Sequence, residues 1–391
     1  MSRLRWLTAG ESHGPELTAI VEGAPAGVEL TAELVDRDLA RRQLGYGRGG
    51  RMKIEKDRVR FTGGVRGGRT LGGPISLVIS NRDHENWLDR MGAAPFETTP
   101  APLREPRPGH ADLAGALKYD RRDLRDILER ASARETAARV AAGAIAKAIL
   151  ALVGVDIAAH VVRIGAVECP EERFASLPME EVRARVSASD VGCVDDATSE
   201  AMRAHILETA HQGDTLGGII EVVAVGCPPG LGSHVQWDRK LDGRLAQAFM
   251  SIQAIKGVEI GLGFRAAARP GSRVHDPIGY DAETRSFTRA SNGAGGVEGG
   301  ISNGAPIVCR LAMKPIATLK RALGSVDIDT KASVAALHER SDVCAVPAAA
   351  VIAEAMMALA LADAALETFG GDSAREFARN ASAYAEQLRG F

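Results

Sequence analysis

Two stretches of the chain share one layout: GESHGPELTAIVEGAPAGV (residues 10–28) and GDTLGGIIEVVAVGCPPGL (residues 213–231). In each stretch, a segment flanked by glycines is followed at the same distance by a Pro-Gly turn. Two more pairs of matching segments follow in the same order, residues 64–75 with 296–307 and residues 129–132 with 339–342. Three matches in one order indicate an internal duplication, with repeats at about residues 3–155 and 205–370.

Each repeat predicts the order strand, Pro-Gly turn, helix, Gly-rich hairpin, strand and long helix. β-Branched runs bounded by Gly and Pro, such as residues 75–79 and 219–225, predict the strands. Apolar residues at helical spacing predict a first long helix that ends at Gly154, and a second one that begins near Pro347. Alanine lines both helices, which favours burial on several sides.

These elements predict an α+β fold, a β-α-β sandwich with a pseudo-twofold internal repeat. The two long helices are expected between two mainly antiparallel sheets. We expect residues 1–391 to form a single domain. The alternative is a pair of separable domains joined through the charged stretch near residues 155–210.

The bulk composition excludes several classes of protein. A net charge of −2 leaves no global positive field for nucleic acid or an anionic membrane. No uncharged apolar run approaches the roughly 20 residues of a membrane span, and the N-terminus has no secretory apolar core. Five scattered cysteines without a CxxC pair argue against a disulfide framework and a metal site. We therefore expect a cytoplasmic protein without a bound metal.

His13 is the first candidate for chemistry. It lies between two glycines at a strand-to-loop transition, where an imidazole can protonate a leaving group. The equivalent residue of the second repeat is Leu216, although the flanking glycines persist. The architecture therefore requires the glycines and not the histidine, while a loop histidine with a structural hydrogen bond is the alternative.

Arginines supply the candidates for anion binding. Arg104, Arg107 and His110 lie in a loop stiffened by two prolines, which suits an anionic ligand, whereas a solvated loop is the alternative. Arg130 and Arg134 are four residues apart and so are expected on one face of a helix. In a buried helix an unpaired arginine is costly, so a ligand is a better explanation than a surface salt bridge.

A second basic segment follows the helix that starts near Thr31. Here Arg41, Arg42, Arg48 and Arg51 flank a Gly-rich loop, which could close over phosphates or be merely mobile. Residues 251–257 and 313–318 offer amide, ammonium and hydroxyl groups at the ends of predicted strands. No GxGxxG after a strand, GxxxxGK[ST] or HExxH motif is present, and the GxSxG match at residues 10–14 is not followed by the helix of a nucleophile elbow, which removes the usual nucleotide, zinc and hydrolase sites.

The combination of residues 10–14, 107–112, 129–136 and 340–342 resembles the chorismate synthase family, and the match runs from about residue 3 to residue 370. The resemblance implies a homotetramer that binds reduced FMN (FMNH2). It also implies an anti-1,4-elimination of phosphate from 5-enolpyruvylshikimate 3-phosphate that gives chorismate in the shikimate pathway, towards aromatic amino acids. The enzyme would then be a carbon–oxygen lyase with no net redox change.

The resemblance also assigns residues. His13 looks like the acid for the departing phosphate, His110 like the group that stabilises the flavin charge, and Asp342 like the carboxylate that assists proton removal. The family's FMN contacts fall on Arg130, Ala131, Ser132, Gln253, Ala254, Gly299, Lys314, Pro315, Ile316, Ala317, Thr318 and Arg340. Its substrate contacts fall on Arg42, Arg48, Arg107 and Arg134.

The chain departs from the family at one place. Family members usually show Lys-Pro-Thr-Ser-Thr or a similar run, whereas Ile316 and Ala317 here remove two hydroxyl groups from the expected FMN site. Without a dinucleotide fingerprint, a separate flavin reductase is favoured as the electron source, with NADPH as an indirect reductant. Two other functions fit the same arginines: a flavin-independent sugar-phosphate lyase and a non-catalytic anion-binding oligomeric scaffold.

Overall fold

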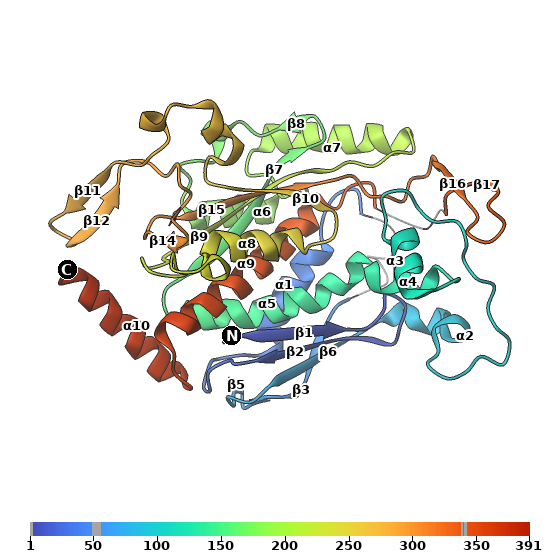
Figure 1. Ribbon diagram of the computed structural model, residues 1–391, viewed down its shortest axis with the longest axis horizontal. Helices are drawn as coiled ribbons and strands as arrows, with labels where there is room; N and C mark the ends of the chain where they lie inside the picture. Colours follow the sequence, from blue (N-terminus) through green and yellow to red (C-terminus); the bar gives the residue numbers. More distant parts are fainter. Residues whose placement is uncertain (1–2, 49–55, 338, 340–341) are drawn as a thin grey trace.

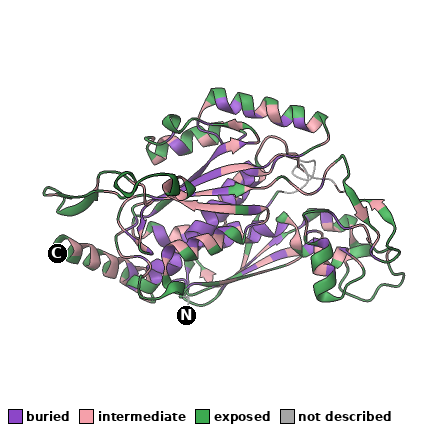
Figure 2. Ribbon diagram, turned by 45° about the horizontal axis from the view of Figure 1, so that its top comes forward, coloured by how far each residue is buried: buried purple, intermediate pink, exposed green. Residues whose placement is uncertain are grey.

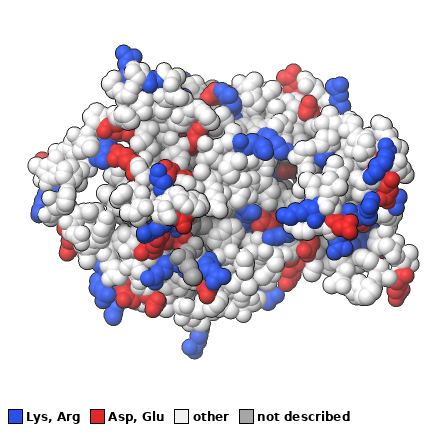
Figure 3. Space-filling model, in the orientation of Figure 1, with Lys and Arg blue, Asp and Glu red and all other residues white. Residues whose placement is uncertain are grey.

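The computed structural model describes residues 3–48, 56–337, 339 and 342–391. Two antiparallel sheets enclose a layer of helices, and the two long helices of this layer are buried along most of their length (Figures 1 and 2). The predicted α+β sandwich is therefore confirmed. Acidic and basic side chains are intermixed over the face drawn in Figure 3, which agrees with the near-neutral net charge.

The two sheets have the same topology. The first has the strand order β1-β2-β6-β3, and the second has β8-β7-β9-β15-β10, so that β7, β9, β15 and β10 repeat the arrangement of the first sheet. The first sheet consists of β1 (Arg5–Ala9), β2 (Glu16–Glu22), β3 (Val59–Gly63) and β6 (Ile75–Ser80). The second consists of β7 (Asp156–Ile164), β8 (Val167–Glu168), β9 (Gly218–Val225), β10 (Ile255–Ile260) and β15 (Ile307–Met313).

The second repeat contains an insertion. The strand β7 occupies the position of β1 in the second sheet, although it precedes residue 205, where the sequence matches begin. Between β7 and β9 lie β8 and the helices α6 (Met179–Ala188) and α7 (Asp196–His211). Figure 1 shows α7 on the outer side of this sheet. The topological repeat therefore extends further towards the N-terminus than the sequence matches reach.

The remaining elements follow the predicted order. The Gly-rich hairpins are β4 (Val65–Arg66) with β5 (Arg69–Thr70), and β13 (Val297–Glu298) with β14 (Ile301–Ser302). Two further hairpins are β11 (Ile278–Asp281) with β12 (Ser286–Arg289), and β16 (Gly324–Val326) with β17 (Ser333–Ala335). The other helices are α1 (Ala32–Gln43), α2 (Leu88–Met91), α3 (Asp112–Tyr119), α4 (Arg125–Ala131), α5 (Thr136–Ala151), α8 (Leu241–Met250), α9 (Val346–Phe369) and α10 (Ala374–Arg389).

The helix α9 is long and apolar enough to cross a membrane by length and composition alone. However, 94% of its most apolar window is buried inside the protein. It packs against α5, α8, α1 and the strands β7 and β9, so its apolar surface is covered by the chain itself. Its composition is therefore that of a core helix.

The first long helix differs from its prediction. Instead of one helix up to Gly154, the chain forms α4 and α5 with a break at Ser132, whose ψ of 142° is extended. The Ser132 hydroxyl accepts a hydrogen bond from the Arg134 amide, so it caps the segment that resumes the helix. The prediction that Arg130 and Arg134 share a helix face is therefore wrong, because the break turns them in different directions.

Charged residues bind the three central helices together. Glu354 of α9 is fully buried and accepts hydrogen bonds from Arg41 of α1 and Lys147 of α5, each at 2.7 Å. Burial opposes its ionisation, but the nearby Lys147 and Arg41 charges outweigh burial and lower the pKa of Glu354 to about 2. Arg41 therefore stabilises the helix layer, unlike its neighbour Arg42, which lines a cavity.

We expect Gly143→Ala to destabilise the protein, because α5 and α9 cross at this glycine. An added Cβ would lie 2.3 Å from the Cβ of Ala355, so the helices would have to separate. The expected loss is about 1–3 kcal/mol of the free energy of unfolding, although alanine is the better helix former by about 1 kcal/mol. Urea denaturation measures the difference.

The matched control is Gly243→Ala in α8. There the added Cβ would have its nearest neighbour at 3.9 Å, so the propensity gain should appear without a clash. We expect Gly243→Ala to raise the free energy of unfolding slightly and Gly143→Ala to lower it. Equal stabilisation by both substitutions would contradict the close helix crossing.

Candidate active site

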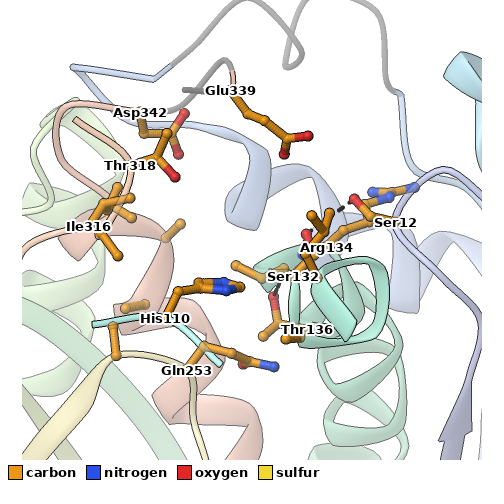
Figure 4. Close-up of a pocket in the computed structure, with 18 of the residues that line it drawn as sticks. Ser12, His110, Ser132, Arg134, Thr136, Gln253, Ile316, Thr318, Glu339 and Asp342 are labelled. Carbon is orange, nitrogen blue, oxygen red and sulfur yellow. Dashed lines mark hydrogen bonds between the residues drawn. The ribbon is translucent and has the colours of Figure 1, made fainter. Parts of the chain in front are cut away.

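A cavity of about 610 Å³ lies at the N-terminal ends of the two long helices. Figure 4 shows Ser12, Ser132 and Arg134 on one side of it, Thr318 and Asp342 on the other, and His110 between them. The predicted site residues that line it are His13, His110, Asp342, Ala131, Ser132, Gln253, Ala254, Lys314, Ile316, Ala317, Thr318, Arg42, Arg48, Arg107 and Arg134. These residues come from stretches that are far apart in the sequence.

Three of the described predicted residues do not line this cavity: Arg130, Gly299 and Pro315. Arg130 is half exposed and donates hydrogen bonds to the carbonyls of Thr8 and Gly10. Gly299 lies at the tip of the β13–β14 hairpin, and Pro315 is absent from the lining. Arg340 lies outside the described residues.

His13 has a defined orientation in the cavity wall. Its Nδ1 lies 2.9 Å from Oε1 of Glu129, and its backbone amide donates to Oε2 of the same residue at 2.8 Å. The imidazole stacks on the ring of Trp87, with 4.1 Å between the ring centroids. Burial opposes ionisation of Glu129, but the hydrogen bond and charge of His13 and the charge of Arg125 outweigh it and lower the pKa of Glu129.

His110 has a similar environment on the other side. Its Nδ1 lies 2.5 Å from Oδ1 of Asp112, which is fully buried at the start of α3. Arg107 holds the same carboxylate with two side-chain hydrogen bonds and contacts Thr318 with its remaining nitrogen. Burial opposes ionisation of Asp112, but the His110 and Arg107 interactions outweigh it and place the pKa of Asp112 well below its usual range.

Arg42 and Arg134 form a buried basic group around Asp57. Arg134 contacts both oxygens of Asp57 at 2.7 Å, while Arg42 lies 3.6 Å away and donates to Thr136 and to the Ala133 carbonyl. Burial, followed by repulsion from Arg134 and Arg48, lowers the pKa of Arg42 to about 9 despite the attraction of Asp57. Positive charge exceeds negative charge here, so an anionic ligand is favoured.

Glu339 and Asp342, which precede α9, line the cavity. Asp342 forms an ion pair with Arg48 at 3.0 Å. Glu339 lies between the two histidine clusters, 3.6 Å from Arg125 and 3.9 Å from Arg107. Both clusters are therefore part of one continuous network of charges.

The strand ends 252–254 and 313–318 meet along one wall of the cavity. The backbone amide of Lys314 donates to the Ala254 carbonyl at 2.9 Å, and Ala254 adopts a left-handed φ of 67°, which costs on the order of 1 kcal/mol. Such strain is common at binding sites. Thr215 donates to the Ile316 carbonyl, so the backbone of this segment is fixed without the two missing hydroxyl groups.

These walls fit a flavin. Ile252, Ile316 and alanines of α9 supply an apolar surface for a planar ring system. The buried Oε1 of Gln253 and Nη1 of Arg42 have no hydrogen-bond partner among the described residues, so polar ligand atoms would satisfy them. The N-terminal ends of α5 and α9 also face the cavity and favour a phosphate group. Lys314, Thr318 and the neighbouring backbone would contact the remaining polar atoms of the cofactor.

The chain is similar to known proteins over nearly its whole length. A family model described as chorismate synthase matches residues 4–366. The chain belongs to the chorismate synthase family. The chorismate synthase of Geobacter sulfurreducens is 57% identical over 395 residues, covering 99% of this chain and 100% of the relative. That of Symbiobacterium thermophilum is 57% identical over 391 residues, covering 98% of this chain and 99% of the relative.

A solved structure of a chorismate synthase has the same fold. It superposes with a TM-score of 0.80 at 44% identity, and the match covers 99% of both chains. The family assignment made from the motifs is therefore confirmed, together with the pseudo-symmetric sandwich. The placement of the individual site residues comes from the geometry of the cavity described above.

The sequence did not single out several polar residues of this chorismate synthase cavity. Glu129 and Asp112 hold the two histidines, Asp57 holds two arginines, and Trp87 covers His13. Asp112 carried a usable signal, because it stands two residues after His110 in the same motif. Asp57 had none, since only the tertiary fold brings it to Arg134.

Proposed function

We propose that this member of the chorismate synthase family removes phosphate and a proton from 5-enolpyruvylshikimate 3-phosphate and requires reduced FMN. One observation carries the proposal: His13, His110 and a set of arginines from distant stretches line a single cavity. A substrate with two carboxylates and a phosphate matches the excess of positive charge around Arg42. Arginine suits such groups because it binds them with two parallel hydrogen bonds.

In this proposal the arginines neutralise and orient the substrate. Arg42, Arg48, Arg107 and Arg134 surround the anionic groups, and closure of the cavity excludes water, which strengthens every charge interaction inside. His13 gives a proton to the departing phosphate oxygen, so that the leaving group carries less charge as the C–O bond breaks. The phosphate leaves with the electron pair of the C–O bond, and the carbon ring of the substrate loses one proton.

The flavin supplies what the side chains lack. Reduced FMN is electron-rich and would supply transient electron density to the reacting carbon as phosphate leaves. His110 lies between the two walls and would stabilise negative charge on the bound cofactor, with Asp112 fixing its orientation. Asp342 would assist proton removal, and its pairing with Arg48 supports a place next to the substrate.

Anaerobic turnover tests the proposal. Product formation is measured with dithionite-reduced FMN and, in parallel, with oxidised FMN plus NADPH. Activity in the first assay alone means that a separate reductase supplies the electrons, and activity in both means that the chain reduces its own flavin. Turnover without flavin would favour a flavin-independent phosphate lyase, and no turnover in any assay would favour an anion-binding scaffold.

The proposal extends to assembly and location. We expect a homotetramer, which sedimentation of the purified protein tests directly. We also expect a cytoplasmic enzyme, because its free cysteines are buried thiols and no pair of them forms a disulfide.

A further inference from the structure

The His13 ring is held on its Nδ1 side by a single carboxylate. The Glu129 carboxylate accepts hydrogen bonds from the ring Nδ1 and from the backbone amide of His13, and the Glu129 side chain is 2% exposed. An ionised carboxylate accepts hydrogen bonds only, so the ring must carry a proton on Nδ1. The atom left for proton transfer to a ligand is then Nε2.

Two further groups support this arrangement. Arg125 donates to Oε1 of Glu129 at 2.9 Å, which keeps the carboxylate ionised and in place. The guanidinium of Arg125 also lies over the Trp87 ring, 4.8 Å from its centroid, and Trp87 stacks on His13. Glu129, Arg125 and Trp87 therefore restrict the imidazole from its edge and from one face.

We propose that Glu129 is a positioning residue that fixes the orientation and the Nδ1-protonated form of His13, so that Nε2 delivers the proton. The inference rests on the proposed role of His13 as the acid for the phosphate group. The carboxylate acts through the imidazole and does not touch the substrate. A buried acid–imidazole pair is a common way to orient a catalytic histidine.

Other ionisable groups around His13 do not replace this carboxylate. Asp83 lies 3.9 Å from Nε2, on the ligand side of the ring, and is itself buried. The Nδ1 atom of His84 contacts the backbone carbonyl of His13 and leaves the imidazole unaffected. Arg125 repels an imidazolium, but it is paired with Glu129. Glu129 is the carboxylate that lies at hydrogen-bond distance from Nδ1.

The His110 cluster supports the same principle independently. There the Asp112 carboxylate is hydrogen-bonded to Nδ1 of His110 and to the guanidinium of Arg107. This is the same sequence of contacts, imidazole to carboxylate to guanidinium, as in the His13 cluster. A third cluster of this kind, His160 with Glu221 and Arg310, lies in the second sheet outside the cavity. It offers a matched control, since it has the same chemistry and no contact with the ligand site.

The test is the pH profile of kcat for Glu129→Gln with reduced FMN and substrate. The substitution removes the negative charge beside Nδ1, so we expect the alkaline limb of the profile to move to lower pH. At pH 8 we expect kcat to fall about 10- to 100-fold, with KM changed by less than about threefold. At pH 6 most of the activity should return.

Two variants control for folding. Glu129→Asp keeps the charge, so its alkaline limb should stay within about half a pH unit of the natural enzyme. Glu221→Gln removes a buried glutamate paired with histidine and arginine elsewhere, and its profile should keep the natural limb whatever its stability. FMN titration and urea denaturation of each variant show that the protein tested is folded and loaded.

The outcomes separate the inference from the proposed function. An unchanged limb in folded, FMN-binding Glu129→Gln overturns the role of Glu129, and so does an equal shift in Glu221→Gln. A limb that persists in His13→Ala removes His13 from the proton transfer, and the inference falls with it. Absence of turnover in the natural enzyme with reduced FMN rejects the proposed function itself.

Discussion

His13→Ala lowers kcat about 100-fold or more, which is the usual contribution of a positioned general acid. The phosphate then leaves with its full charge, while the arginines around Asp57 still bind the substrate. KM should therefore change much less than kcat, because the missing interaction belongs to the transition state. Steady-state kinetics under anaerobic conditions with reduced FMN measure both constants.

The control for this substitution is His211→Ala. His211 is exposed at the end of α7, outside the cavity, so its loss should leave kcat within about twofold.

His110→Ala should also lower kcat about 100-fold, because His110 lies between the two walls of the cavity. Full activity of His13→Ala with FMN bound would show that another group, or water, protonates the phosphate.

Arg134→Met lowers the free energy of unfolding by about 3–5 kcal/mol. The Asp57 side chain is fully buried and depends on two hydrogen bonds from Arg134, so the substitution leaves a carboxylate without its main partner. Methionine retains most of the volume, and the loss is therefore electrostatic. Urea denaturation measures it, and KM for the substrate should rise as well.

Arg130→Met is the comparison, four residues earlier. Arg130 is half exposed and contacts backbone carbonyls, so its loss should cost less than about 1 kcal/mol. The double variant Asp57→Asn with Arg134→Met should recover part of the stability, because the uncompensated charge is gone. Equal costs for Arg130→Met and Arg134→Met would contradict the different directions that the helix break gives them.

The fold was predictable because its signals are repeated along the chain. The paired Pro-Gly turns and Gly-rich hairpins stand at fixed distances from apolar runs, and the alanine-rich helices must be buried. The strand β7 escaped detection because an insertion separates it from the rest of its repeat. The break at Ser132 was also missed, since apolar spacing continues through it and only a cap reveals it.

The lining of the cavity was predictable where a short motif is unusual in its local sequence. His13, Arg107 and His110 stand in segments whose glycines and prolines mark them as unusual, and all line the cavity. Except for Asp112, which follows His110 by two residues, the buried carboxylates of the site have no such local signal. Asp57 and Arg134 are separated by 77 residues in the sequence, and His13 and Glu129 by 116. Their pairing therefore depends on the packing of the fold rather than on a local sequence pattern.

The two repeats contribute opposite walls to a single cavity, with Ser132 and Arg134 from the first and Lys314 and Thr318 from the second. Because each wall comes from a different repeat, the two walls need not carry the same side chains, unlike the two halves of a symmetric homodimer. The imidazole of His13 and the aliphatic side chain of Leu216, the equivalent residue of the second repeat, differ in this way.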